Sequence, residues 1–217
     1  MSIGGGVSLY YEAVGEGNAP VVFVPGSVMS SRVFEHQMAH FETSSCYRAL
    51  ALDSRGQGRS TGRKKRTPFE QHGKDLERFF HHLGLHGIVL VCWSAGVVKA
   101  LSYVHQFGSA SLRGLVLVDG APRASTTGSA KEWVTVVGPK AATNGDVDRA
   151  SDLAALDGDV PLLFVVREDL SGLVNDWAAT HTPHAEVVAM GRHLMLWEQH
   201  AEFNALLDRF LTQPRPG

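Results

Sequence analysis

The length, composition and charge of this chain exclude several classes of function. Its 217 residues, 44% hydrophobic and 19% charged, suit one globular domain with at most a modest insertion. The net charge of −2 at pH 7 provides no general attraction to nucleic acid or to an anionic membrane, and no apolar run approaches the roughly 20 residues that span a bilayer.

Strands and helices are predicted to alternate from residue 20 onward. Before them, alternating polarity at 7–14 predicts an antiparallel strand. In chain order, the patterns then predict a strand at 20–24, a helix at 30–41, a strand at 47–53, a helix at 68–85, a strand at 87–93, a helix at 94–107, strands at 112–120, 160–166 and 186–190, and a closing helix at 201–211. This order indicates the α/β fold class, with a mostly parallel, doubly wound sheet covered by helices on both faces.

Polar residues follow the carboxyl ends of most predicted strands. They are Pro25-Gly26-Ser27, Asp53-Ser54-Arg55, Ser94, Asp119, Glu168-Asp169 and, after the last strand, His193. In an open α/β sheet, the active groups lie beyond the carboxyl ends of the strands. We therefore expect these residues, which come from distant parts of the chain, to meet at one edge of the sheet.

The stretch VLVCWSAGV (89–97) places Ser94 between a predicted strand and a predicted helix. A tight turn at this point would lift the serine off the sheet edge and aim the first N–H groups of the helix at a reacting carbonyl. Ala95 and Gly96 are small enough for the strand and helix to pass closely. The alternative is that Ser94 only caps the helix, which serine does well.

The two cysteines are interpreted as packing residues. Cys92 stands where G-x-S-x-G has its first glycine, but a thiol in apolar surroundings has a raised pKa and little thiolate, so Ser94 remains the candidate nucleophile. Cys46 is given the same packing role. Two cysteines form no disulfide framework, and the first residues combine no basic segment with an apolar core, so we expect no signal peptide and a cytoplasmic location.

Five ordered motifs carry a resemblance to a known family. They are GGVSLYYEAVGEGNAPVVFVPG, LDSRGQGRS, VCWSAGV, LVLVDGAPR and MGRHLMLWEQHAEFNALLDRFL. Together they resemble the α/β-hydrolase superfamily, and specifically its small esterase and haloperoxidase-like branch, from about residue 7 to residue 211. The resemblance implies an α/β-hydrolase core at 1–122 and 159–217. A short cap would occupy 123–158, with Trp133, Val134 and Val136–Val137 either facing the site or packing the cap onto the core.

The resemblance also assigns roles to particular residues. Ser94 would attack an acyl carbon, and His193 would accept its proton and return it to the leaving group. The backbone N–H groups of Ala95 and Ser27 would form the oxyanion hole. Pro25 stands where relatives usually have a histidine before the glycine, a change that leaves backbone donation intact.

The acid that orients the histidine is assigned less directly. Relatives carry it after the seventh strand in a pattern like P-x-L-x-x-x-G-x-x-D. Counted from Pro161, this pattern puts its glycine at Arg167 and its acid at Leu170. Asp169, one residue early, is the first choice, and Asp119 at the end of the sixth strand is the main alternative. Others are Glu168 and Asp176, while the Glu168-Asp169 pair could simply start a helix, where acidic residues suit the helix dipole.

Cofactor and metal motifs are not evident. The chain has no G-x-G-x-x-G after its first strand and no Walker loop, so we infer no nucleotide cofactor. His36 and His40 have helical spacing for a metal but lack the glutamate of H-E-x-x-H, and we interpret them as surface or capping histidines. The basic run RKKR at 63–66 is interpreted as a solvated loop.

These observations predict a serine hydrolase. It would cleave a small-molecule carboxylic ester, or a lactone or thioester, through an acyl-enzyme on Ser94 with His193 as base. One alternative uses peroxide in place of water at the same site, which gives perhydrolase or haloperoxidase-type activity. Another is a ligand-binding or signalling member of the fold without catalysis. The serine argues against the epoxide hydrolase and dehalogenase branches, which need an aspartate at this position.

Overall fold

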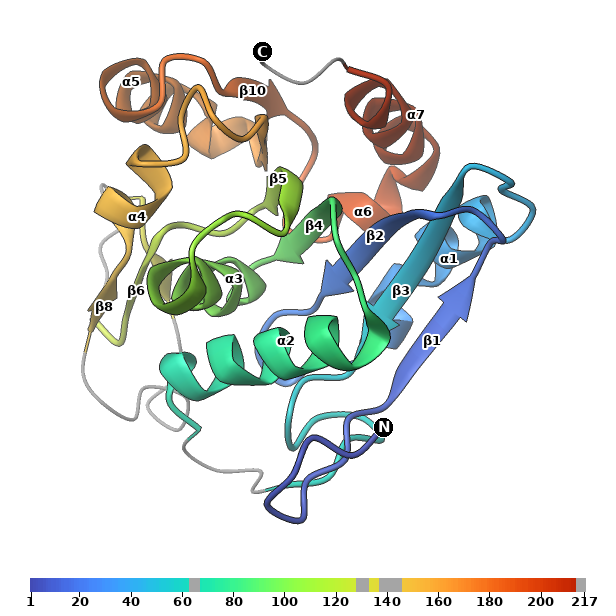
Figure 1. Cartoon of the computed structure of the whole chain (residues 1–217). Coiled ribbons are helices and arrows are strands. Elements are labelled where there is room, and N and C mark those ends of the chain that lie inside the picture. The colour runs from blue at the N-terminus through green and yellow to red at the C-terminus, as the bar shows by residue number, and fades with distance from the viewer. Residues whose placement is uncertain (63–66, 128–132, 137–145, 214–217) are drawn as a thin grey trace.

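A seven-stranded sheet forms the centre of the computed structural model, which describes residues 1–62, 67–127, 133–136 and 146–213 (Figure 1). Its strands, in spatial order, are β1 (Tyr11–Val14), β3 (Tyr47–Leu52), β2 (Ala19–Val24), β4 (Ile88–Trp93), β5 (Leu112–Val118), β9 (Leu162–Val166) and β10 (Glu186–Ala189). β1 pairs antiparallel with β3, and the other neighbours pair in parallel. The predicted α/β class with a mostly parallel sheet is confirmed.

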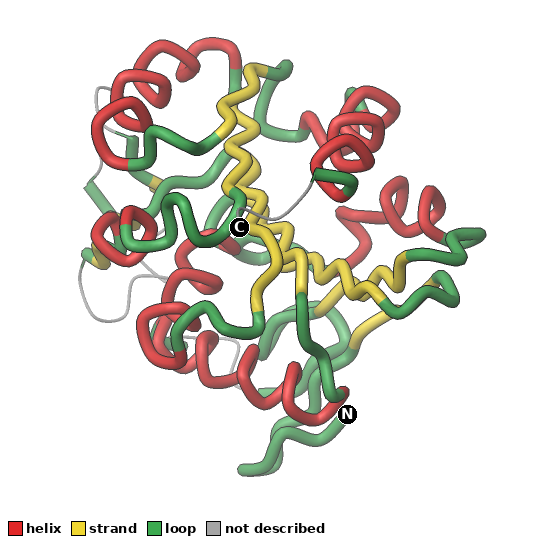
Figure 2. Tube along the Cα trace, turned by 45° about the horizontal axis from the view of Figure 1, so that its top comes forward, coloured by secondary structure: helices red, strands yellow, loops and turns green. Residues whose placement is uncertain are grey.

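Helices cover both faces of this sheet (Figures 1 and 2). One face packs against η1 (Ser31–Phe34), α1 (Glu35–Phe41), α6 (Met195–Glu198) and α7 (His200–Leu211). The other face packs against α2 (Phe69–Leu83), α3 (Gly96–Phe107), α4 (Ala150–Ala154) and α5 (Ser171–His181). The sheet is thus the middle of three layers, and its strand ends are left open for a site.

The central strands are almost entirely apolar because both of their faces are covered. All six residues of β4 are buried. Leu90 and Cys92 face the cluster under α2 and α3, while Val91 and Trp93 face the cluster under α1 and α7. The strand immediately before Ser94 is therefore anchored on two sides.

A second, three-stranded sheet lies within the predicted cap. It consists of β7 (Thr135–Val136), β6 (Arg123–Ser125) and β8 (Val147–Asp148). Trp133 is buried and packs on Phe164 and Trp177, with ring centroids 5.4 and 4.8 Å apart, so it does anchor this segment to the core. Val136 is 65% exposed. Val137 and the basic run 63–66 lie outside the described residues.

The predicted elements differ from the observed ones in instructive places. The first strand begins at Tyr11 rather than at residue 7, and β5 ends at Val118 because Asp119 takes a positive φ of 40°. Helix α5 was not predicted. Val174 and Ala178 are its buried residues, so the helix has too narrow an apolar face to produce a clear period.

Candidate active site

Ser94 occupies a sharp turn between β4 and α3 at the carboxyl edge of the sheet. Its φ is +55°, in the left-handed region that residues other than glycine rarely adopt. Its N–H donates to the carbonyl of Val118 at 2.8 Å, and its own carbonyl accepts from the N–H of Val97 at 3.0 Å. These bonds hold the strained turn in place, as is common at functional sites.

Three glycines make room for the turn. A Cβ on Gly26 would lie 3.0 Å from the Cβ of Ser94, and one on Gly120 would lie 2.3 Å from the Ser94 carbonyl oxygen. A Cβ on Gly96 would lie 2.4 Å from the carbonyl oxygen of Val24. The close approach predicted for Gly96 is thus present, and Gly26 and Gly120 extend it to the strands on either side.

The position two residues before Ser94 needs no glycine. Cys92 is fully buried, and burial raises the pKa of its thiol far above the ordinary value. Its side chain fills the core beneath α3, so the packing interpretation of Cys92 is confirmed. The same interpretation is wrong for Cys46, which is exposed.

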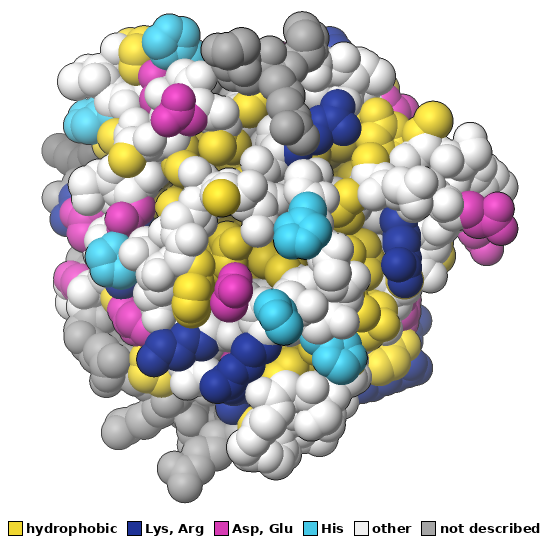
Figure 3. Space-filling view, in the orientation of Figure 1, with side chains coloured by type: hydrophobic (Ala, Val, Ile, Leu, Met, Phe, Trp, Pro, Cys, Tyr) yellow, Lys and Arg dark blue, Asp and Glu magenta, His cyan; other side chains and the backbone are white. Residues whose placement is uncertain are grey.

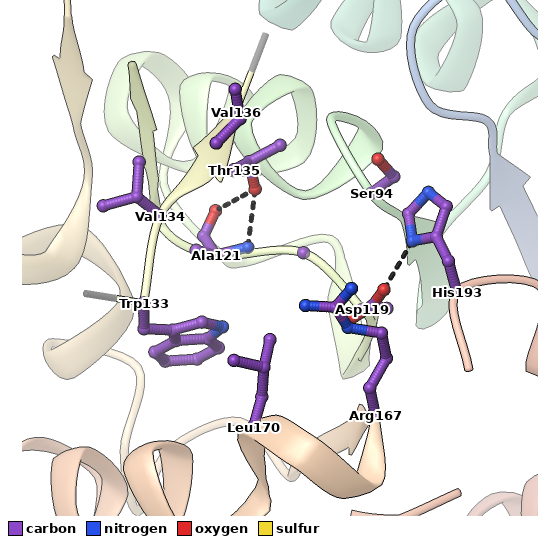
Figure 4. Close-up of a pocket in the computed structure, with 11 residues that line it drawn as sticks. Ser94, Asp119, Ala121, Trp133, Val134, Thr135, Val136, Arg167, Leu170 and His193 are labelled. Atoms are coloured by element: carbon purple, nitrogen blue, oxygen red, sulfur yellow. Dashed lines mark hydrogen bonds and ion pairs between the residues drawn. The ribbon is translucent and has the colours of Figure 1, made fainter. Parts of the chain in front are cut away.

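His193 faces Asp119. Asp119 follows β5 directly, and its N–H donates to the carbonyl of Val165 at 2.8 Å. Its carboxylate, only 6% exposed, makes a short contact through Oδ2 with Nδ1 of His193. Figure 4 shows the imidazole lying between this carboxylate and the hydroxyl of Ser94. A carboxylate on Nδ1 leaves Nε2 for the side of the serine, which is the arrangement a general base requires.

The structure describes both Ser94 and His193, and no hydrogen bond joins them. They line one cavity of about 290 Å³, and the side chain of His193 is 47% exposed. Such bonds are often long without substrate and tighten when substrate binds.

Asp169, the first-choice acid, does not reach His193. The short 3-10 helix η2 (Glu168–Leu170) begins almost directly after β9, and it leaves the side chain of Asp169 71% exposed. Its Oδ1 lies 3.4 Å from Nε of Arg167, and no hydrogen bond or ion pair links it to His193, which the structure also describes. Glu168 and Asp176 are exposed as well. The geometry therefore brings the alternative acid, Asp119, to the imidazole, and it does not bring Asp169 there.

Trp93 ties the serine turn to the histidine loop. Its Nε1 donates to the backbone carbonyl of His193 at 2.9 Å, and the two rings are 4.8 Å apart between centroids. Sequence reasoning missed this contact. The signal that could have revealed it is a large aromatic residue immediately before the candidate nucleophile.

A buried lysine holds the loop that carries Ser27. Nζ of Lys99, on α3, donates to the carbonyls of Pro25 at 2.8 Å and Gly26 at 3.1 Å, and to Oγ of Ser54 at 2.9 Å. Lys99 is 3% exposed, and burial lowers its pKa to about 7. Sequence reasoning missed this residue too, although a lysine within the apolar run GVVKALSYV was a visible signal.

The two expected oxyanion donors are available. Within the described part of the chain, the N–H groups of Ser27 and Ala95 donate no hydrogen bond. Ala95 stands at the start of α3, and Lys99 holds the loop of Ser27 through the carbonyls before it. Their free N–H groups suit an oxyanion that forms beside Ser94.

The cavity at this site is mixed in character. Its lining residues are Ser94, Asp119, Gly120, Ala121, Trp133, Val134, Thr135, Val136, Arg167, Leu170 and His193 (Figure 4). Oγ1 of Thr135 accepts a hydrogen bond from the N–H of Ala121 at 2.8 Å, which joins the small sheet to the segment after β5. Residues of the core and of the predicted cap therefore share one cavity.

Metal and surface features add little to this site. Among the residues the structure describes, no three His, Cys, Asp or Glu side chains are grouped so that they could hold a metal ion. His40 pairs with Asp208, and the ring of His36 packs on that of His200, 4.1 Å between centroids. None of the described helices is long and apolar enough to cross a membrane. On the face in Figure 3, Lys and Arg are interspersed with Asp, Glu and His rather than gathered in one patch.

Part of the chain matches a known protein family and several proteins of known activity. The family described as alpha/beta hydrolase fold matches residues 19–181. A non-heme chloroperoxidase of Kitasatospora aureofaciens is 32% identical over 117 residues, which are 54% of this chain and 42% of that protein. A bifunctional esterase/perhydrolase of Acinetobacter calcoaceticus is 30% identical over 118 residues, with the same 54% and 42% coverage. The matched region thus spans less than half the length of these relatives.

Solved structures match nearly the whole chain. A thermophilic esterase from Thermogutta terrifontis superposes with a TM-score of 0.77 at 21% identity, covering 94% of this chain and 93% of that one. At that identity, the likeness shows the fold.

Proposed function

This chain belongs to the α/β hydrolase family, and on that premise we propose that it is a cofactor-free serine hydrolase of small-molecule carboxylic esters, lactones or thioesters. One observation carries the proposal. Ser94, Asp119 and His193, from the turns that follow β4, β5 and β10, line one cavity with the imidazole between the other two side chains (Figure 4).

The proposed reaction has two halves. Oγ of Ser94 attacks the acyl carbon while Nε2 of His193 takes its proton, and the carboxylate of Asp119 stabilises the imidazolium. The N–H groups of Ala95 and Ser27 hold the oxyanion, at about 3 kcal/mol of transition-state stabilisation for one donor. His193 then protonates the leaving alcohol. Water attacks the acyl-enzyme, again with His193 as base, and releases the acid and the free serine.

The exposed imidazole and the family relationship also support the perhydrolase alternative. The side chain of His193 is 47% exposed, so a small nucleophile other than water can reach an acyl-enzyme beside it. One relative is named as both an esterase and a perhydrolase. In this alternative, hydrogen peroxide replaces water in the second half-reaction, and the product is a peracid. Formation of peracetic acid from acetate and hydrogen peroxide, lost in Ser94→Ala, is the measurement for it.

Two further predictions, on the cap and on the cellular location, complete the proposal. We propose that residues 123–158 form a short cap over the nucleophile, with the core at 1–122 and 159–217. Trp133 and Val134 of this segment do line the cavity beside Ser94. We also propose a cytoplasmic location, because neither cysteine forms a disulfide.

Labelling with a fluorophosphonate tests the nucleophile. The reagent is added to the protein and the adduct is mapped by mass spectrometry. We expect one adduct on Ser94, none in Ser94→Ala, and slow labelling in His193→Ala. The matched control Ser45→Ala removes an exposed loop hydroxyl and should label like the wild type. No adduct on the wild-type protein would contradict the serine mechanism and favour a non-catalytic binding protein.

A further inference from the structure

Arg167 places a guanidinium group in the wall of the catalytic cavity. It follows β9 directly and lines the cavity together with Ser94, Trp133 and Leu170 (Figure 4). Its side chain is 36% exposed. Among the described residues that line this cavity, it is the only lysine or arginine. The mixed wall of the cavity thus carries one guanidinium beside the carboxylate of Asp119 and the apolar side chains of Trp133 and Leu170.

The guanidinium of Arg167 is incompletely paired. Its Nε is buried without a hydrogen-bond partner, although Oδ1 of Asp119 lies 3.5 Å away and Oδ1 of Asp169 lies 3.4 Å away. Its terminal nitrogens donate no hydrogen bond to any residue that the structure describes. Arg55 shows the contrast within this chain, since its Nε donates to Asp75 at 2.6 Å and its Nη2 donates to the same carboxylate.

Neither nearby carboxylate can satisfy this guanidinium. The other oxygen of Asp119 is engaged by His193, and a full salt bridge with Arg167 would compete with that contact. Asp169 is 71% exposed, and it does not line the catalytic cavity. Arg167 therefore has donors available for a ligand that enters the cavity.

The enclosed side of the cavity suits the acyl part of a substrate. His193 protonates the leaving alcohol, and its side chain is 47% exposed, so the alcohol departs on the open side. Trp133 is only 7% exposed, and Figure 4 shows it across the cavity from His193, with the guanidinium of Arg167 between them. Trp133 and Leu170 offer apolar surface for the methylene groups of an acyl chain.

Resting on the proposed function, we propose that Arg167 binds a free carboxylate at the far end of the acyl chain, so that the preferred substrates are monoesters of short dicarboxylic acids. The planar fork of a guanidinium matches a carboxylate with two parallel hydrogen bonds. Nε of Arg167 lies 3.5 Å from one oxygen of Asp119, whose other oxygen contacts His193. The anion site is thus close to the reacting centre, which fits a chain of a few carbons.

A matched pair of esters tests this site. One is mono(4-nitrophenyl) glutarate, and the other is its methyl-capped form, in which the distal carboxylate is neutral. We expect the wild-type enzyme to favour the charged ester in kcat/KM. Arg167→Gln should lower the ratio of charged to neutral kcat/KM by about tenfold or more, mainly through KM. Arg167→Lys should restore only part of it, because an ammonium lacks the fork.

A control variant separates a local carboxylate site from the general effect of positive charge near the active site. Arg192→Gln removes the exposed arginine immediately before His193. Arg192 does not line the catalytic cavity, so this variant should leave the ratio of charged to neutral kcat/KM near the wild-type value. Equal losses on both esters in Arg167→Gln, or a wild-type ratio near one, would overturn the carboxylate site.

Calorimetry distinguishes this inference from the proposed function. Glutarate is titrated into Ser94→Ala and into Ser94→Ala/Arg167→Gln, whose folding is checked by thermal unfolding. Binding that weakens about tenfold or more in the double variant supports the site even if no ester is hydrolysed. Equal binding to both variants overturns it, while fluorophosphonate labelling of Ser94 would leave the hydrolase itself standing.

Discussion

The titration of Lys99 should make the free energy of unfolding depend on pH. Burial lowers its pKa from 10.5 to about 7. The unfolded chain keeps this proton up to pH 10.5, so between about pH 7 and 10.5 the unfolded state binds more protons than the folded state. The free energy of unfolding therefore rises with pH across that window. Each pH unit adds up to about 1.36 kcal/mol, so this one group contributes roughly 2 kcal/mol between pH 7 and pH 9.

Urea unfolding of the wild type and of Lys99→Met at pH 7 and pH 9 measures this effect. Methionine keeps most of the volume and does not titrate. The wild type should gain about 2 kcal/mol more than the variant on going from pH 7 to pH 9. Cys92, whose thiol also titrates in the unfolded chain, is present in both proteins and cancels in the difference. The same pH dependence in both proteins would contradict a lowered pKa of Lys99.

Three further predictions concern the surroundings of the site. Gly120→Ala should slow fluorophosphonate labelling and lower stability by about 1–3 kcal/mol, because its Cβ would lie 2.3 Å from the carbonyl oxygen of Ser94; unchanged labelling would contradict the crowded turn. Trp93→Phe removes the 2.9 Å hydrogen bond to the His193 carbonyl, and kcat should fall by about tenfold; a change in KM alone would speak against a positioning role. Burial and the charges of Lys99 and Arg55 lower the pKa of His72 below 6.5, so the unfolded chain binds a proton there that the folded chain does not. The free energy of unfolding should therefore drop as the pH falls below 6.5, and it should drop less in His72→Asn. Urea unfolding at pH 6.5 and 4.5 measures this drop, and equal drops in both proteins would contradict a lowered pKa of His72.

The sheet was predictable because its central strands are mainly apolar runs. β4 and β9 are buried at every position, and their six and five residues are the length of a strand and too short for a buried helix. The elements of the predicted cap were not predictable, because strands of two or three residues such as β7 and β6 carry no period. Their position depends on tertiary contacts, such as Trp133 on Trp177, that no local pattern encodes.

The site was only partly predictable for a similar reason. Ser94 and His193 sit in motifs whose local sequence sets their place, and the structure brings them to one cavity. The acid was chosen by counting along the chain, and counting does not reveal that η2 turns Asp169 toward solvent. Asp119 reaches the imidazole because a left-handed backbone with φ of 40° aims its carboxylate there. The contacts of Lys99 with the carbonyls of Pro25 and Gly26 join residues more than 70 positions apart, and the only sequence signal for them is a lysine within an apolar run.

The most direct test of the proposed catalytic triad compares Asp119→Asn with Asp169→Asn. Hydrolysis of 4-nitrophenyl acetate is measured for both variants and for the wild type, with folding checked by thermal unfolding. Asp119→Asn should lose activity by a factor on the order of 10³–10⁴, because the amide cannot stabilise the imidazolium. Asp169→Asn should stay near the wild-type rate, since its carboxylate is 71% exposed and contacts Arg167. Loss in Asp169→Asn with activity kept in Asp119→Asn would contradict a catalytic triad of Ser94, His193 and Asp119.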